Sequence, residues 1–389
     1  MIYLDNAATT VWKPPAVGAA MAAFLAGAPG SPGRSGHRVA LDVARQIFDV
    51  RVALAEFFGL DDARRLIFTR NATEALNLAL HGWLRADDHV VATSLEHNAV
   101  MRPLRHLRET RGIRVTWVAA DGEGRLDPAA VAAAVRPATR LVVVNQASNV
   151  VGTLAPLAEI RARIGAVPLL VDAAQSAGAV PIAVEREGID MLAFTGHKAL
   201  HGPTGIGGLC LAPGIELDPL VLGGTGSRSE SDAQPEALPD RLESGTPNTV
   251  GIVGLGAALA WRDSLAGGTA DIAAQERALA AALLAGLREI PEVKLHGPAT
   301  MEARLPVLAF NLVGRACSDI AHELDRQHGV MTRPGLHCAP RAHQTLGTFP
   351  AGCVRLSLAC SNREADIAPV LSAIRTLARQ PAPARSEAP

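Results

Sequence analysis

Between about residues 63 and 212, short apolar runs rich in β-branched residues alternate with longer stretches of helical periodicity. Six of these runs have the character of strands: RLIFT, HVVAT, IRVTWV, RLVVVN, VPLLVD and IDMLAF. Short apolar strands separated by helical segments are typical of a parallel sheet that is covered by helices on both faces. The pattern therefore predicts an α/β fold with a mainly parallel sheet in a large domain.

The chain after Leu211 has a different pattern. A stretch rich in Gly, Pro and Ser, residues 223–249, has little periodicity and is expected to form an extended loop. Helical periodicity then covers about 250–289, broken at Gly267 and Gly268, and the remainder predicts strand, helix, strand, strand and helix. We expect a large domain over 15–250, a small α+β domain built from 1–14 and 251–379, and a flexible tail over 380–389.

The composition excludes several classes of protein. The 389 residues carry 38 acidic and 37 basic side chains, so the overall charge offers no attraction to nucleic acid or to an anionic membrane. No stretch approaches the ~20 uninterrupted apolar residues of a membrane span. The N-terminus MIYLDNAATT does not have the pattern of a signal peptide, and five scattered cysteines are too few for a disulfide framework. These features predict a soluble, cytoplasmic protein.

Lysine is rare in this chain, and its rarity narrows the candidate chemistry. Of the 37 basic residues only three are lysines: Lys13, Lys198 and Lys294. Arginine cannot replace a lysine that must attack a carbonyl as a free amine, so Schiff-base chemistry has three candidates. Lys198 follows a predicted strand in a Gly-rich turn, a setting in which desolvation lowers the pKa of an amine. Lys13 and Lys294 are interpreted as solvated charges.

Several polar residues follow predicted strands, where ligands bind to parallel sheets. Asp172 closes VPLLVD and either caps the next segment or pairs with a protonated heterocyclic nitrogen, as a pyridoxal cofactor requires. His97 follows HVVAT and is either structural or catalytic. The turn that leads into Ala72 and Thr73 opens a helix whose free N–H groups suit a phosphate, although most helix N-termini bind nothing.

Two residues of the predicted small domain also have candidate roles. Cys338 lies in MTRPGLHCAPRAH near Arg333, His337 and His343, and cationic neighbours favour a nucleophilic thiolate. A metal site of His337, Cys338 and His343 is an alternative, but no CxxC pair accompanies it, and no metal is predicted. The other cysteines are interpreted as small buried hydrophobes. Arg355, in the apolar strand CVRLSLAC, needs a partner, either a substrate carboxylate or a structural ion pair.

Ten segments taken in order resemble one known family, the class V aminotransferase-like, pyridoxal-phosphate-dependent cysteine desulfurases and selenocysteine lyases. They are YLDNAATT, SPGRSGHRVA, FTRNATEALNLA, SLEHNAV, NQASNVVGT, VDAAQSAG, AFTGHK, ESGTPNT, RPGLHCAP and VRLSLACSN. The resemblance covers nearly the whole chain, and RPGLHCA is similar to the second group of desulfurases. It implies the pyridoxal-phosphate-dependent transferase fold type I with a seven-stranded type of sheet, and a homodimer with shared active sites.

The resemblance also implies roles for individual residues. Lys198 would carry the cofactor as a Schiff base, His97 would stack on the pyridine ring, Asp172 would pair with the ring nitrogen and Gln175 with the phenolic oxygen. The phosphate would be held by Thr73, Thr195 and His197, by the backbone of Ala72, and by Thr246 from a second subunit. Asn149 would lie beside cofactor and substrate, and Arg333 and Arg355 would bind the substrate. Cys338 would accept the sulfur. Ala72 stands where many relatives have threonine, which removes one phosphate donor.

The predicted reaction converts L-cysteine to L-alanine and leaves the sulfur on Cys338 as a persulfide, from which an acceptor protein can take it. The nearest alternative is a selenocysteine lyase acting on L-selenocysteine. A cysteine β-lyase or an aminotransferase on the same fold is a further alternative. A non-enzymatic sulfur or metal carrier that uses His337 and Cys338 is a prediction of a different class, and it assigns no role to Lys198.

Overall fold

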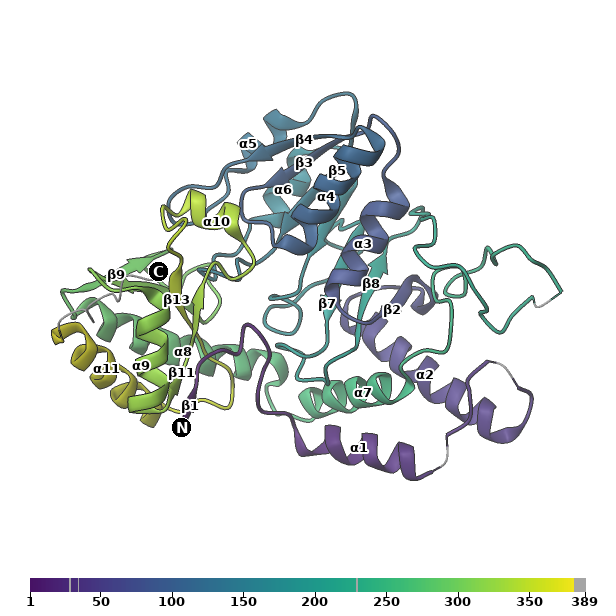
Figure 1. The fold of residues 1–389 in the computed structure, drawn as a ribbon. Helices are drawn as coiled ribbons and strands as arrows, with labels where there is room; N and C mark the ends of the chain where they lie inside the picture. The colour runs from purple at the N-terminus through teal and green to yellow at the C-terminus, as the bar shows by residue number, and fades with distance from the viewer. Residues whose placement is uncertain (28, 34, 229, 381–389) are drawn as a thin grey trace, which may run out of the picture.

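The computed structural model of the protein describes residues 1–27, 29–33, 35–228 and 230–380. Its secondary structure forms two bodies side by side, the larger around a seven-stranded sheet and the smaller around a four-stranded sheet (Figure 1). Of the predicted tail over 380–389, all but Gln380 lies outside the described residues.

The large sheet confirms the predicted mainly parallel architecture. Its strands are β2 (Leu66–Thr69), β3 (His89–Thr93), β4 (Arg114–Val118), β5 (Thr139–Asn145), β6 (Leu169–Asp172), β7 (Met191–Thr195) and β8 (Gly207–Leu211), in the spatial order β2-β8-β7-β6-β5-β3-β4. Strands β3 to β7 are parallel, and β8 runs antiparallel to both of its neighbours. Strand β8 needs glycine because a Cβ on Gly207 would lie 2.5 Å from the carbonyl oxygen of Phe194.

Helices cover both faces of this sheet, which explains why its central strands are largely apolar on both faces. In β5, Leu141 and Val143 join one core with the helices α3 and α4, while Val142 and Val144 join the core on the opposite face. The helices of the large body are α1 (Pro15–Ala26), α2 (Arg38–Phe57), α3 (Ala72–Trp83), α4 (Asn98–Arg111), α5 (Pro128–Ala134), α6 (Leu157–Arg163) and α7 (Thr249–Asp263), with the 3-10 turn η1 (Ala63–Arg65) before β2.

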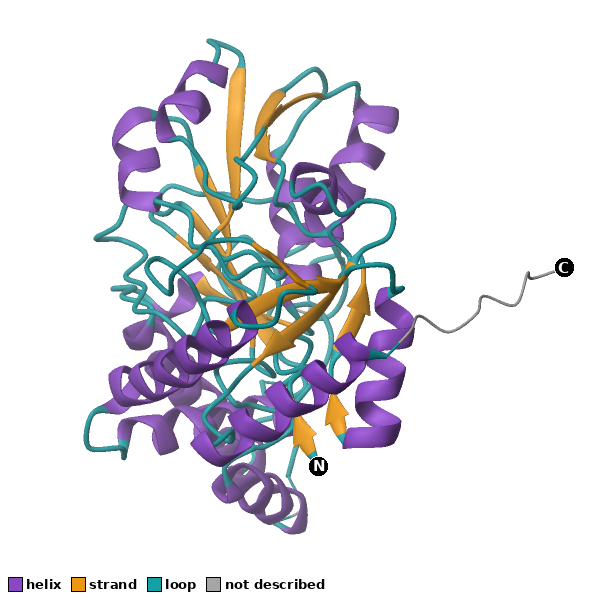
Figure 2. Ribbon diagram, turned by 90° about the vertical axis from the view of Figure 1, so that its left-hand side faces the viewer, coloured by secondary structure: helices purple, strands orange, loops and turns teal. Residues whose placement is uncertain are grey.

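The smaller body is built on an antiparallel sheet of order β12-β13-β10-β9. Its strands are β9 (Val293–His296), β10 (Val307–Leu312), β12 (Arg333–Gly335) and β13 (Cys353–Ser357), and its helices are α8 (Gly268–Arg288), α9 (Cys317–His328), α10 (Pro340–Thr345) and α11 (Glu364–Arg379). Figure 2 shows helices packed along the outside of the strands. At the N-terminus, β1 (Ile2–Tyr3) pairs in parallel with β11 (Val330–Met331).

The long polar segment is an extended loop, as expected. Residues 212–228 and 230–248 contain no helix or strand, and part of this segment projects from the large body in Figure 1. After this loop the chain returns to the large sheet, because Ile252 and Leu255 of α7 belong to the core beneath it. The predicted domain boundary at residue 250 stays a prediction. Helix α7, which spans this boundary, packs in the core of the large body.

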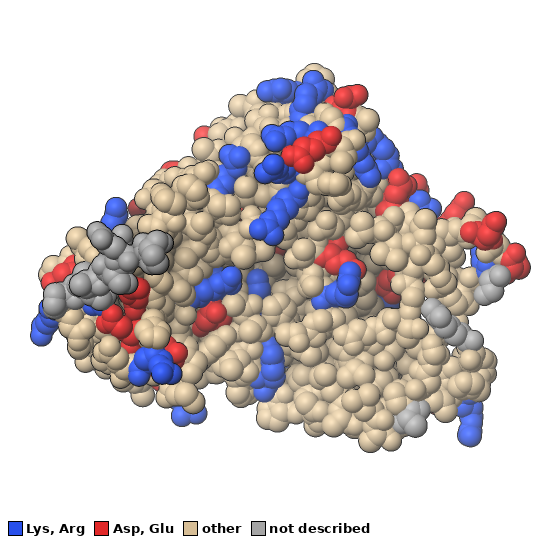
Figure 3. Space-filling view, in the orientation of Figure 1, with Lys and Arg blue, Asp and Glu red and all other residues tan. Residues whose placement is uncertain are grey.

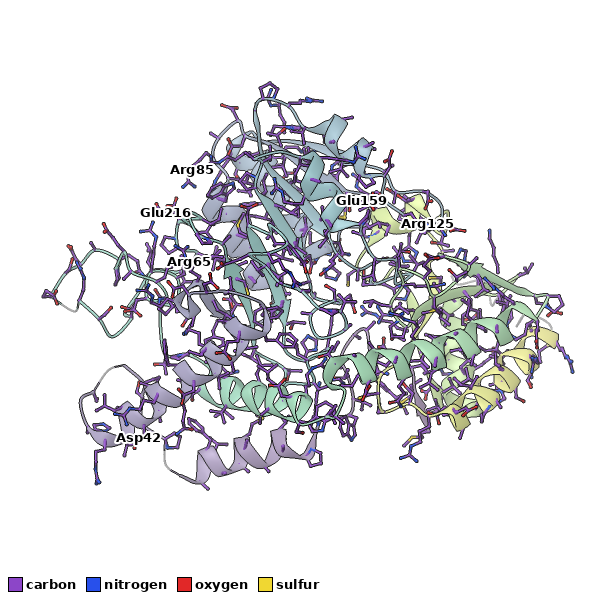
Figure 4. All side chains as sticks on the ribbon, turned by 180° about the vertical axis from the view of Figure 1, so that it is seen from behind. Asp42, Arg65, Arg85, Arg125, Glu159 and Glu216 are labelled. Atoms are coloured by element: carbon purple, nitrogen blue, oxygen red, sulfur yellow. The ribbon has the colours of Figure 1, made fainter. Side chains whose placement is uncertain are left out.

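The surface carries interspersed charges of both signs on the face shown in Figure 3. Exposed charged side chains such as Asp42, Arg85, Arg125 and Glu159 lie on the outside of the molecule (Figure 4). Among the described residues, no helix combines the length and the apolar character that crossing a membrane requires.

Candidate active site

A cavity lies where the parallel strands of the large sheet end. Strand β6 ends at Asp172, which pairs with Asn145 at the end of β5, and β7 ends beside them at Thr195. The cavity brings together nine predicted cofactor residues: Ala72, Thr73, His97, Asn149, Asp172, Gln175, Thr195, His197 and Lys198. Five segments far apart in the sequence thus supply one site.

Asp172 is a buried carboxylate on the wall of this cavity. Its side chain is 3 % exposed, and Oδ1 accepts a hydrogen bond from the backbone N–H of Ala174 at 2.9 Å. Burial raises the pKa of Asp172, while the Ala174 bond and the charge of Lys198 oppose this rise. The segment 173–179 contains turns and no helix, so Asp172 does not serve as a helix cap.

Lys198 occupies the turn after β7 and lines the same cavity. Burial lowers its pKa to about 8, with the charge of Asp172 acting in the opposite direction. A lysine with such a pKa supplies free amine near neutral pH, as attack on a carbonyl requires.

The interpretation of Lys13 as a solvated charge is wrong. Its Nζ donates hydrogen bonds to Thr10 Oγ1 at 2.6 Å and to the carbonyl oxygen of His197 at 2.7 Å, and burial lowers its pKa to about 8. Two prolines follow Lys13 and turn the chain into α1, which leaves this side chain against the turn that carries Lys198. Lys294 is exposed, as expected.

His97 caps helix α4 and contributes a neutral ring to the cavity. Its Nδ1 accepts a hydrogen bond from the backbone N–H of Ala99 at 3.0 Å, and this bond assigns the ring proton to Nε2. Burial lowers the pKa of His97 to about 4, and the positive charge of Lys198 acts in the same direction. The ring is therefore uncharged at neutral pH.

Glu96 was not predicted, although it directly precedes His97. It is completely buried, and Oε1 accepts hydrogen bonds from Thr93 Oγ1 at 2.7 Å and from the backbone N–H of Asn145 at 2.9 Å. Burial raises the pKa of Glu96 to about 8. Glu96 thus ties the end of β5 to the turn that carries His97. The available signal was an acidic residue shortly after the end of a run with strand character.

One end of the cavity is rich in hydrogen-bond donors. Helix α3 begins after Asn71, whose side chain accepts from the backbone N–H of Glu74 at 3.0 Å, and the first N–H groups of a helix have no partner within it. Thr195 Oγ1 and His197 Nδ1 are buried polar atoms without a hydrogen-bond partner in the part of the chain that the structure describes. A helix N-terminus beside unused polar atoms fits a phosphate group. We call the N-terminus of α3, Thr195 and His197 together the phosphate cradle.

Gln175 and Asn149 connect the cavity to neighbouring segments. Gln175 Nε2 donates to the carbonyl oxygen of Ala7 at 3.0 Å, and Asn149 Nδ2 donates to that of His337 at 2.7 Å. The Oδ1 atom of Asn149 is buried and unpartnered within the described residues, so it remains available to a bound molecule. These residues and the phosphate cradle fit the cofactor that the sequence resemblance implies.

Arg355 lies on β13, outside the cavity lining, and its guanidinium is 1 % exposed. Nη2 donates to Asp5 Oδ1 at 2.5 Å, and Nη1 donates to the carbonyl oxygen of Asn149 at 3.0 Å. The structure therefore supplies the ion-pair partner that the sequence required, and nothing in the sequence pattern pointed to Asp5. A role for Arg355 at a substrate carboxylate stays a prediction.

Cys338 is exposed on the turn between β12 and α10. Its carbonyl oxygen accepts from the backbone N–H of Asn98, the first residue of α4, at 2.8 Å. Arg333 Nη2 lies 3.7 Å from its Sγ. Cys338 is thus anchored next to His97, although it does not line the cavity itself.

The other four cysteines differ from Cys338 in their surroundings. Cys210, Cys317 and Cys353 are buried, as expected, and Cys360 is half-buried. Burial raises the pKa of Cys353 to about 12 and that of Cys360 to about 11. The thiols of Cys353 and Cys360 therefore remain protonated at neutral pH.

Thr246 lies apart from the other predicted cofactor residues. It is exposed and lines a second cavity together with Arg70, Glu74 and Asn248. Within one chain the structure does not bring Thr246 to the phosphate cradle, and its predicted contribution to a second subunit stays a prediction.

A lysine, an aspartate and a phosphate cradle at the ends of a mainly parallel seven-stranded sheet define the fold type I class of pyridoxal-phosphate-dependent enzymes. Residues 2–370 match the family Aminotransferase class-V, and the chain belongs to this family. The cysteine desulfurase of Yersinia pestis (strain Pestoides F) is 34% identical over 378 residues, which are 94% of this chain and 91% of that protein.

Solved structures agree with this assignment. The apo cysteine desulfurase from Thermococcus onnurineus NA1 superposes with a TM-score of 0.90 at 31% identity, covering 97% of this chain and 94% of that one. The Escherichia coli cysteine desulfurase CsdA superposes with a TM-score of 0.85 at 28% identity, covering 96% and 94%. The predicted family and fold type are confirmed.

Proposed function

We propose that the protein is a pyridoxal-phosphate-dependent cysteine desulfurase that converts L-cysteine to L-alanine and takes the sulfur onto Cys338. The observation that carries this proposal is the joint geometry of the cavity and the cysteine turn. Lys198 and Asp172 share the cavity, and bonds from Asn149 and Asn98 hold the turn of Cys338 beside it. Similarity to cysteine desulfurases supports the choice of substrate.

The cavity residues divide the task of holding the cofactor. Lys198 would bind it covalently, Asp172 would pair with its ring nitrogen, His97 would contact its ring face and Gln175 its phenolic oxygen. Thr73, Thr195, His197 and the N-terminus of α3 would hold its phosphate. When bound, the cofactor supplies an electron sink for the negative charge that develops at the substrate Cα.

The chain's own residues then move one proton and orient the substrate. The amine of Lys198 has a lowered pKa and accepts the Cα proton at Nζ. Asp172 would pair with the ring nitrogen of the bound cofactor, and its negative charge would keep that nitrogen protonated. Arg355 binds the substrate carboxylate, and Asp5 and the carbonyl of Asn149 hold its guanidinium in a fixed orientation.

Cys338 carries out the sulfur transfer. Its thiolate attacks the substrate sulfur and forms a new S–S bond, while the substrate C–S bond breaks and leaves its electron pair on carbon. That carbon takes up a proton and becomes the methyl group of L-alanine. Arg333, 3.7 Å from Sγ, places a positive charge beside the sulfur during the transfer. A cytoplasmic acceptor protein would then collect the sulfur from Cys338.

We also propose a homodimer in which Thr246 completes the phosphate site of the neighbouring subunit. Thr246 is exposed and lies outside the cavity of its own chain, which is the position that a shared site requires. Light scattering on the active enzyme is expected to report a dimer. A fully active monomer would contradict this part of the proposal.

The experiment is product analysis with purified wild type, Cys338→Ala and, as a matched control, Cys210→Ala at a buried cysteine of β8. Each protein receives L-cysteine with reductant and, separately, L-selenocysteine. Alanine from L-cysteine that disappears in Cys338→Ala and persists in Cys210→Ala is the expected result. Alanine from L-selenocysteine alone indicates a selenocysteine lyase, and pyruvate indicates a β-lyase. A yellow cofactor absorbance that is lost in Lys198→Ala excludes a non-enzymatic carrier.

A further inference from the structure

The backbone on either side of the Cys338 thiol has an unusual conformation. His337 and Cys338 both have positive φ, +49° and +57°, which is the left-handed region that non-glycine residues rarely adopt. Two such residues in succession persist only where surrounding contacts hold them. The groups that hold this turn therefore determine where the thiol lies.

Backbone contacts tie the turn to the cofactor cavity. The carbonyl oxygen of His337 accepts from Asn149 Nδ2 at 2.7 Å, and that of Cys338 accepts from the backbone N–H of Asn98 at 2.8 Å. These bonds fix two carbonyl groups, but they leave the side of the turn facing the small body to be fixed by other groups.

A buried network of hydrogen-bonded side chains occupies that side. His337 Nε2 lies 2.9 Å from the carbonyl oxygen of Arg333, His337 Nδ1 lies 3.2 Å from His343 Nε2, and His343 Nδ1 lies 2.7 Å from Thr348 Oγ1. The two rings are stacked with centroids 5.4 Å apart, and their residues are 3 % and 0 % exposed. This network begins at Arg333 on β12, the strand that precedes the turn, and ends at Thr348, beyond α10.

The protonation of the two histidine rings follows from the groups at the two ends of this hydrogen-bonded network. A carbonyl oxygen only accepts, so Nε2 of His337 carries a proton and its Nδ1 accepts from His343 Nε2. Nδ1 of His343 then accepts from the Thr348 hydroxyl. Each ring holds one proton and makes a hydrogen bond at both nitrogens. Burial lowers the pKa of His343 to about 4 and that of His337 to about 3, so both rings are neutral at working pH.

Cys353 completes a trio with these histidines in which the ligand atoms lie within 4.8 Å of one another, a spacing that a metal ion could also use. The hydrogen bonds already use all four ring nitrogens, and burial raises the pKa of the Cys353 thiol to about 12. The observations therefore favour a network of hydrogen bonds over a metal site.

We propose that His343 is a positioning residue for sulfur transfer, because it fixes the ring of His337 and, through that ring, the left-handed turn that presents Cys338. The proposal rests on the proposed desulfurase function. His343 itself lies on α10 and is completely buried, so it contacts neither substrate nor cofactor.

The variants follow from this network. His343→Leu removes both ring nitrogens, whereas His343→Gln keeps an N–H group that can donate to His337. Thr348→Val, a milder change, removes the hydroxyl proton at the far end of the network. His89→Leu is the matched control, because His89 is also buried and bonded to two hydroxyl groups, those of Thr139 and Thr116, but in β3.

Three readouts on the holoenzyme separate positioning from general damage. The first is alanine formation from L-cysteine. The second is exchange of the Cα proton of L-alanine in D2O, which uses the cavity and not the Cys338 thiol. The third is the pH profile of Cys338 alkylation by iodoacetamide, followed by peptide mass spectrometry. His343→Leu is expected to slow alanine formation at least tenfold, to change the alkylation profile and to leave Cα exchange within twofold of wild type.

The remaining variants refine this expectation. His343→Gln is expected to recover most of the lost rate, Thr348→Val to lose less than His343→Leu, and His89→Leu to match wild type in alanine formation and alkylation. Recovery by Gln distinguishes a hydrogen-bonding role from a packing role, since Gln and Leu are of similar size.

Several results would overturn the proposal. Unchanged alanine formation and an unchanged alkylation profile in His343→Leu would refute it, as would a parallel loss of Cα exchange. One zinc ion per wild-type chain, lost in His343→Leu, would replace the proposal with a metal site. A wild-type enzyme that makes no alanine would instead refute the proposed function, and the alkylation profile would still decide the role of His343.

Discussion

Lys198→Met is expected to make the cofactor-free protein more stable at neutral pH, although it removes the residue proposed to be essential for activity. Burial lowers the pKa of Lys198 from 10.5 to about 8, which means that the folded protein holds the ammonium form at a cost. At about 1.4 kcal/mol for each pH unit, this cost is about 3 kcal/mol below pH 8. Methionine has a similar length and carries no charge to desolvate.

The sign of the effect depends on pH. The unfolded chain binds the proton more tightly than the folded chain, so wild-type stability rises as the pH rises from about 8 to about 10.5. The advantage of the variant is therefore full at pH 7 and nearly gone above pH 10.5. Below pH 8 it does not change with pH.

Urea unfolding of cofactor-free wild type and Lys198→Met at pH 7, 9 and 10.5 measures this difference directly. Lys294→Met is the matched control, because Lys294 is exposed on β9 and its replacement is expected to change stability by less than about 0.5 kcal/mol at each pH. A Lys198→Met protein less stable than wild type at pH 7, or a gain that does not shrink with rising pH, would refute the reasoning.

Three further predictions concern carboxylates in and near the site. Asp5→Asn leaves the buried guanidinium of Arg355 without a charged partner and is expected to lower the free energy of unfolding by about 3 kcal/mol, with a urea-measured loss below about 1 kcal/mol contradicting the role of this pair. Asp172→Asn keeps an oxygen for the Ala174 bond but removes the charge; alanine formation is expected to fall about 100-fold or more, and near-normal turnover would count against the assigned role. Burial raises the pKa of Glu96 from 4.5 to about 8, so wild-type stability falls as the pH rises through that window. Glu96→Gln is expected to lose this dependence in urea unfolding from pH 5 to 9. Identical pH profiles of the two proteins would disprove this effect of Glu96.

Much of the site could be predicted from the sequence because its residues follow strands. Asp172, His97 and Lys198 each come shortly after a run with strand character, and the carboxyl ends of parallel strands meet at one edge of a sheet. That rule places side chains without any knowledge of tertiary contacts. The end of β8 at Cys210 was likewise recognised as an apolar strand, although Gly207 and Gly208, which close packing requires, weaken its pattern.

Contacts between segments far apart in the sequence could not be predicted in this way. Arg355 pairs with Asp5 across nearly the whole length of the chain, and no local pattern encodes such a pairing. Helix α10 has only six residues, too few to show periodicity. Lys13 has the sequence context of an exposed residue, and only the path of the N-terminal segment past the turn of His197 buries it.

The pairing of the first strand with a late one has a consequence for the order of synthesis. Ile2 pairs with Val330, and Asp5 reaches Arg355, so these residues leave the ribosome well before their partners are made. At about 5–20 residues per second, that delay lasts roughly 20 to 70 s. The large sheet can fold during this interval, but the ion pair between Asp5 and Arg355 forms only after Arg355 has been made. Partly made chains therefore lack the ion pair that fixes Arg355, and with it the site proposed for a substrate carboxylate.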